Sequence, residues 1–130
     1  MSILKSGIIV LGISFVVALG ACTSKPIMNV SNTPISTGKS LQANQVREAI
    51  TAAGIALGWQ IVESMPGVLQ GTLRLRDHTA VVDIPYTSSD YSIKFKSGVN
   101  LGEKDGQIHK NYNGWVQNLD NRIKAELSRL

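Results

Sequence analysis

The chain has 130 residues, of which 43% are hydrophobic and 17% charged, and its formal net charge is +4. This makeup fits one ordinary globular domain with an extra apolar segment, excludes two domains, and gives no indication of repeats or a charged disordered tail. One of the 13 basic residues, Lys5, lies in the N-terminal segment described next, and 12 basic and 9 acidic residues remain without it. This excess of positive charge is too small to indicate nucleic-acid binding.

The N-terminal segment is almost continuously apolar over residues 8–21. Lys5 precedes the run, and the small residues Gly20 and Ala21 end it, which is the layout of a cleavable secretory signal. A membrane-spanning helix needs about 20 apolar residues, and this run is shorter and interrupted by glycine. The sequence therefore predicts a signal peptide over residues 1–21.

The end of that segment, Leu19-Gly20-Ala21-Cys22, resembles the lipobox at which lipoprotein signal peptidase cuts before a lipid-modified cysteine. The resemblance implies a mature chain that starts at Cys22 and is held in a membrane by several acyl chains, each buried methylene contributing about 0.8 kcal/mol. Cys22 is the only cysteine, so no intrachain disulfide is possible. By resemblance to Gram-negative sorting, Thr23 in place of aspartate favours the outer membrane, on its periplasmic face.

The segment after Cys22 is rich in Ser, Thr, Asn and Pro up to about residue 42. We predict that residues 22–42 comprise the lipidated cysteine and a flexible tether, with an end-to-end distance of about 25 Å for a coil of this length. In an alternative interpretation, part of this segment, Pro26 to Val30, lies along a sheet edge.

Residues 43–130 are predicted to form a single domain that begins and ends with a helix. The first helix carries an apolar stripe, is capped by Asn44 and ends at Gly58. The second runs from Ile108 to Leu127, with an irregularity or a close backbone contact expected at Gly114. The stripe of the first helix comprises Val46, Ala49, Ile50, Ala53 and Leu57.

Between the helices, four segments alternate apolar and polar residues as half-buried strands do. Short turns, including Pro66-Gly67, connect them. We therefore predict an α+β two-layer sandwich of order α-β-β-β-β-α, a four-stranded antiparallel meander with both helices on one face. The strands are predicted at 59–65, 68–76, 79–86 and 91–96, and the open face should carry Gln60, Gln70, Arg74, Asp83, Lys94 and Lys96.

Residues with catalytic or metal-binding chemistry are sparse. The only two histidines are His78 and His109, so a His/Cys metal cage is unsupported and no cofactor is expected. Either histidine could approach Ser92 or Ser97, but no nucleophile-elbow motif is present, so we do not expect an enzyme.

The most polar cluster beside the core comprises residues 108–115. In the functional interpretation, a ligand pocket forms between Asn100 and the helix start, lined by His109, Tyr112 and Asn113. In the structural interpretation, Tyr112 and Trp115 anchor the core while His109 and Asn113 fix the adjoining loop.

The stretch from Val46 to Leu127 resembles a family of small, mostly uncharacterised proteobacterial outer-membrane lipoproteins. The resemblance implies a lipoprotein with a compact α+β domain and transfers no activity, substrate or catalytic residue. It rests on Gly58-Trp59, Pro66-Gly67, Arg76-Asp77-His78, Tyr91-Ser92-Ile93, Asn100-Leu101 and Ile108-His109-x-x-Tyr112-Asn113-x-Trp115.

Three functional hypotheses follow. The first is a non-catalytic, lipid-anchored protein that binds another envelope component. The second is a periplasmic module that binds a small ligand or a cell-wall fragment. The third, an envelope enzyme, requires a histidine hydrogen-bonded to a nucleophile or an acid in a cleft.

Overall fold

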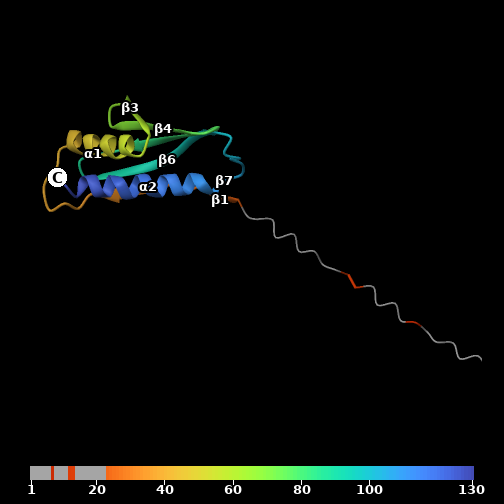
Figure 1. Ribbon diagram of the computed structural model, residues 1–130. Coiled ribbons are helices and arrows are strands. Elements are labelled where there is room, and N and C mark those ends of the chain that lie inside the picture. The colour runs from red at the N-terminus through yellow and green to blue at the C-terminus, as the bar shows by residue number, and fades with distance from the viewer. Residues whose placement is uncertain (1–6, 8–11, 14–22) are drawn as a thin grey trace, which may run out of the picture.

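A computed structural model describes residues 7, 12–13 and 23–130 (Figure 1). The predicted signal peptide, apart from positions 7, 12 and 13, and the predicted lipidation of Cys22 lie outside the described residues. The elements are β1 (Ser24–Pro26), β2 (Val30–Pro34), α1 (Ala43–Ala56), β3 (Gln60–Met65), β4 (Val68–Leu75), β5 (His78–Pro85), β6 (Asp90–Val99), β7 (Gln107–His109) and α2 (Lys110–Leu127).

The main sheet has five antiparallel strands in the order β2-β6-β5-β4-β3. The predicted α+β class and the consecutive pairing of β3 to β6 are confirmed. At the turn between β3 and β4, Gly67 adopts a positive φ of 80°, a conformation that glycine adopts without strain. The prediction of four strands is corrected to five, because β2 adds to the edge of β6.

The fifth strand comes from the segment that the composition assigned to a flexible tether. β1 pairs with β7, with Ser24 opposite His109, and β2 pairs with β6, with Val30 opposite Ile93. The scattered apolar residues of this polar segment pack against the core, which offsets the entropy lost on ordering it. These partly buried residues are Ile27, Met28, Val30 and Ile35.

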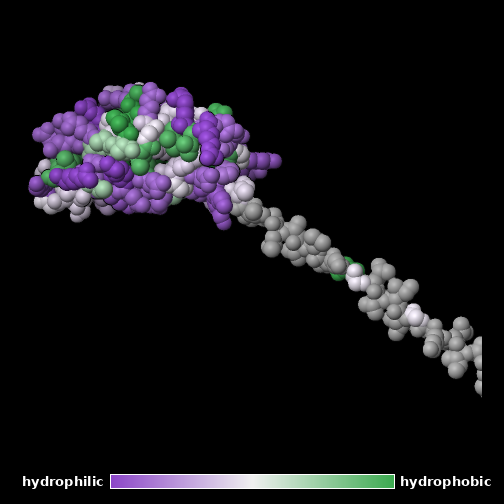
Figure 2. All heavy atoms as spheres, in the orientation of Figure 1, coloured by the Kyte–Doolittle hydropathy of each residue, from purple (hydrophilic) through white to green (hydrophobic). Residues whose placement is uncertain are grey.

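The two helices pack against each other and lie together on one face of the sheet (Figure 1). In the same orientation, Figure 2 shows a mostly hydrophilic surface interrupted by patches of hydrophobic residues. The α1 stripe is buried as predicted, except that Leu57 is only partly covered. The helix begins at Ala43 after the N-cap Gln42, whose backbone N–H donates to Gln45 Oε1 at 2.9 Å. The prediction that Asn44 caps this helix is wrong, because Asn44 lies inside it. Gly58 ends it with a φ of 83°, as predicted.

Two glycines in the helices have opposite surroundings. A Cβ added at Gly54 would lie 2.5 Å from side-chain carbons of Ile61, so α1 and β3 approach closely there. A Cβ at Gly114 would meet nothing within 4 Å, and α2 continues through this position. The irregularity or close contact predicted at Gly114 is therefore absent.

The other sheet face carries polar side chains, as predicted. Lys96 Nζ donates to Gln70 Oε1 at 3.1 Å and lies 3.5 Å from Asp83 Oδ1, while Arg74 donates to Gln60 Oε1 at 3.4 Å. We call this surface the open sheet face. Neither helix in the described part of the chain combines the length and apolar character needed to cross a lipid bilayer.

Candidate functional site

Tyr112, one of the four residues predicted to line a ligand pocket, lies in the core. Its side chain is fully buried, and its ring meets Phe95 edge-on with 5.3 Å between ring centroids. The hydroxyl is buried without a hydrogen-bond partner among the described residues, and burial raises the pKa of Tyr112. Tyr112 is therefore a core anchor, as the structural interpretation proposed.

Asn113, the second of these residues, binds the end of β1 and the connection that follows it. Its Oδ1 accepts from the Met28 backbone N–H at 2.9 Å, and its Nδ2 donates to the Pro26 carbonyl oxygen at 2.8 Å. Both polar atoms of the amide thus bind a segment 85 or more residues away in sequence. We call this arrangement the Asn113 clasp.

Asn100 and His109 lie beside His78, a residue that was not included in the predicted ligand pocket. The Nδ1 of His78 lies 2.7 Å from the Asn100 carbonyl oxygen, and its ring centroid is 6.0 Å from that of His109. The Asn100 side chain donates to Asp77 Oδ2 at 2.8 Å, and His109 caps α2 by accepting from the Asn111 N–H. The turn signal Arg76-Asp77-His78 was visible in the sequence, but its proximity to α2 was not.

These contacts bring Asn100 and His109 together beside His78, bury Tyr112 and direct Asn113 to β1. A pocket lined by all four residues stays a prediction. No set of three or more His, Cys, Asp or Glu side chains in the described residues is arranged to hold a metal ion. The Ser92 hydroxyl, a candidate nucleophile, accepts from the Asn32 N–H on neighbouring β2 at 2.8 Å.

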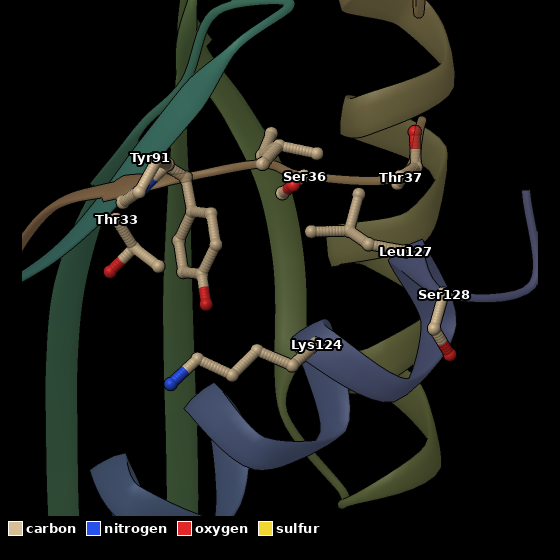
Figure 3. Close-up of a pocket in the computed structure, with 9 residues that line it drawn as sticks. Thr33, Ser36, Thr37, Tyr91, Lys124, Leu127 and Ser128 are labelled. Atoms are coloured by element: carbon tan, nitrogen blue, oxygen red, sulfur yellow. The ribbon is translucent and has the colours of Figure 1, made fainter. Parts of the chain in front are cut away.

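A pocket lies at the opposite end of α2, with a cavity volume of about 220 Å³ (Figure 3). Figure 3 shows the Tyr91 ring and the Lys124 side chain converging from β6 and α2, with Leu127 and Ser36 across from them. We call it the Tyr91–Lys124 pocket. Its lining comprises Thr33, Pro34, Ile35, Ser36, Thr37, Tyr91, Lys124, Leu127 and Ser128.

A buried carboxylate stands behind the polar wall of this pocket. Asp120 Oδ1 accepts from the Tyr91 hydroxyl at 2.5 Å, and Asp120 Oδ2 lies 2.9 Å from Lys124 Nζ. The Asp120 side chain is only 6% exposed, whereas that of Lys124 is 55% exposed. Burial, followed by the hydrogen bond and negative charge of Asp120, raises the pKa of Tyr91. The carboxylate is thus satisfied on both oxygens, as a buried charge requires.

Sequence reasoning missed this network. The available signal was Asp120 next to the apolar stripe of α2 with Lys124 four residues later, a spacing that places both on one helix face. Tyr91 was predicted only as a strand residue, since its contact with α2 spans 29 positions.

The pocket suits a small polar ligand. Lys124 keeps two ammonium protons for a ligand acceptor after its contact with Asp120. The Tyr91 hydroxyl, which donates to Asp120, keeps an acceptor lone pair, while Leu127 and Ile35 offer an apolar wall. The volume is below the roughly 300–1,000 Å³ of pockets for drug-sized ligands, so a ligand of about one sugar ring is the size that fits.

Comparisons of the chain with protein-family models, with curated proteins and with solved structures found no match. The resemblance to proteobacterial lipoproteins accordingly stays a prediction from the motifs quoted above.

Proposed function

We propose that this chain is a non-catalytic lipoprotein of the bacterial envelope, anchored in the outer membrane through lipid on Cys22 and binding another envelope component. The lipobox-like residues 19–22 and the apolar segment before them support the anchor. The partner is a protein or polymer of the periplasmic side.

The observation that carries the proposal is how closely the folded domain follows the anchoring residue. The carbonyl oxygen of Thr23 accepts a hydrogen bond from the Lys110 N–H at 2.7 Å, and β1 begins at Ser24. A domain that starts one residue after the lipid attachment is held at the membrane surface, and its open sheet face remains available to a partner.

Intact-mass measurement of the membrane-extracted protein tests the anchor. We expect a chain that starts at Cys22 and carries acyl groups, and we expect Cys22→Ser to abolish acylation and membrane retention. A protein that retains its first 21 residues, or an unmodified Cys22 thiol, would overturn the proposal.

In-cell photocrosslinking tests the partner. A photoreactive residue at Lys94 samples the open sheet face, and one at Glu48, which is exposed on α1, serves as the matched control. We expect a discrete crosslinked product from position 94 and none from position 48. Recovery of only the monomer from both positions counts against a partner on this face.

The Tyr91–Lys124 pocket favours a second function, a periplasmic module that binds a small ligand or a cell-wall fragment. N-acetylglucosamine is a suitable first probe because it has the size of one ring and carries hydroxyl and amide acceptors. We expect NMR shifts confined to the pocket residues, lost in Lys124→Met and kept in Lys94→Met. Unchanged spectra with this sugar and with soluble cell-wall fragments would remove this candidate.

A further inference from the structure

One end of the domain combines the attachment point of the N-terminal chain with exposed aliphatic and basic residues. Figure 1 shows β1, β7, the start of α2 and the turn between β4 and β5 at this end, and the C-terminus at the other. Leu75 pairs with His78 in register, His78 lies beside His109, and His109 pairs with Ser24. We call this surface the anchor end, and its exposed residues are Lys25, Leu75, Arg76, Asp77, Val99, Glu103, Lys104, Asp105 and Lys110.

Hydrogen bonds hold β1 and the residues on either side of it against this surface. Thr23 is bonded to Lys110, the Ile27 N–H donates to the Gly106 carbonyl oxygen at 2.9 Å, and the Asn113 clasp holds Pro26 and Met28. One peptide link spans about 3.8 Å between Cα atoms, and in the sequence a single such link joins Thr23 to the residue before it. A lipid on Cys22 therefore leaves the anchor end no room for a spacer between domain and bilayer.

The chemistry of the anchor end suits a lipid headgroup layer. Leu75 and Val99 are 46% and 60% exposed, and their pairings with His78 and Thr79 put them at the same end of the sheet, one on each face. Lys110 occupies the first position of α2, where the helix dipole favours a carboxylate instead of a cation. The Lys110 backbone N–H donates to the Thr23 carbonyl oxygen at 2.7 Å, so this basic residue lies next to the attachment point.

The charge at this end is nearly balanced. Four basic residues meet three acidic ones, a net charge of +1, so electrostatic attraction alone is too weak to hold the domain. The acyl chains supply the anchoring, and the surface only has to be compatible with headgroups. The residues counted are Lys25, Arg76, Lys104 and Lys110 against Asp77, Glu103 and Asp105.

We propose that the anchor end lies directly on the lipid headgroups, with Leu75 and Val99 at the interface and the lysines near headgroup phosphates. The inference rests on the proposed acylation of Cys22. With α2 upright on the membrane, Lys124 lies 14 residues after Lys110, and a rise of about 1.5 Å per residue puts the Tyr91–Lys124 pocket about 21 Å farther from the membrane. The pocket and the β5–β6 turn thus face the periplasm.

Fluorescence quenching in vesicles tests this orientation. The acylated protein is reconstituted into phosphatidylcholine vesicles that contain a lipid with a headgroup nitroxide. A fluorophore is placed on Glu103→Cys at the anchor end or on Ser88→Cys in the β5–β6 turn; each is the only free thiol once Cys22 is acylated. We expect strong quenching at position 103 and little at position 88.

A linker variant provides the matched control. Ten Gly/Ser residues inserted between Cys22 and Thr23 have a root-mean-square span of about 17 Å, so quenching at position 103 should fall towards that at position 88. Vesicle flotation is measured on the same samples. Protein that fails to float contradicts the lipid anchor, whereas protein that floats with equal quenching at both positions, or with no effect of the linker, overturns the orientation.

Discussion

The two ends of α2 are attached to the rest of the domain by different kinds of polar contact. At the anchor end, the Asn113 clasp uses two neutral hydrogen bonds to backbone groups of the N-terminal segment. At the other end, Asp120 is a buried carboxylate that binds a tyrosine hydroxyl and a lysine. The difference teaches that one end is held by neutral hydrogen bonds of modest strength, while the other depends on a buried charge that is costly to leave unsatisfied.

The far end should be the more sensitive of the two. Asp120→Ala leaves the Tyr91 hydroxyl without its acceptor, and we expect a loss of about 2–3 kcal/mol in the free energy of unfolding. Asp83→Ala is the control, because its ion pair with Lys96 on the open sheet face contributes less than about 1 kcal/mol. Urea titration of both variants measures the difference, and equal losses would break the comparison.

At the anchor end, Asn113→Ala should cost about 1–2 kcal/mol in the free energy of unfolding, since two neutral hydrogen bonds are lost, one partly buried and one exposed. The effect should be local, with faster amide hydrogen exchange at Met28 and at Ile27. Asn118→Ala, an exposed change on the same helix, should leave that exchange unaltered. Uniform acceleration across the domain would show that the clasp is not an independent feature of this end.

The first half of α2 can be stabilised without changing the contacts of Asn113 or Asp120. Gly114→Ala should stabilise the domain by about 1 kcal/mol, because alanine is the better helix former and its Cβ meets open space. The same change at Gly54 in α1 should destabilise, since its Cβ would clash with Ile61. Thermal unfolding of the pair gives opposite shifts, and a loss at position 114 would contradict the open surroundings.

The smallest effect at neutral pH is expected at Tyr112, whose hydroxyl makes no hydrogen bond among the described residues. Tyr112→Phe should change stability by less than about 1 kcal/mol at pH 7. Burial raises the pKa of Tyr112, so the folded state favours the protonated hydroxyl. The stability linked to this proton is fully present below the ordinary tyrosine pKa near 10 and is lost as the pH rises further. Unfolding at about pH 8 and about pH 11 should show a smaller alkaline loss in the variant, and equal losses would contradict this.

Most of the fold could be predicted because its signals are local. The alternation of apolar and polar residues located β3 to β6, and the stripe from Tyr112 to Leu127 located α2. β2 could not be found in this way, because it is a short polar strand whose stability comes from pairing with β6. Asn and Pro, which β2 contains, are depleted in strands, so the composition of this segment indicated a coil and misassigned it.

The candidate sites were less accessible to sequence reasoning. The polar residues of the α2 start were singled out, but which groups they bind depends on segments distant in the chain. Asn113 meets Pro26, and Asp120 meets Tyr91, across 87 and 29 positions. No periodicity encodes such pairs.

The sequence by itself determined the α+β class, the consecutive pairing of β3 to β6 and the apolar faces of both helices. These features follow from the spacing of apolar residues within each element, which is a local property of the sequence. It also supplied the prediction of a lipid anchor at Cys22. Only the tertiary structure decided that the segment after Cys22 forms β1 and β2, which pair with β7 and β6, and that Asp120 binds Tyr91 and Lys124 behind one pocket. The physical reason is that these features arise from hydrogen bonds and burial between segments that meet only when the chain has folded.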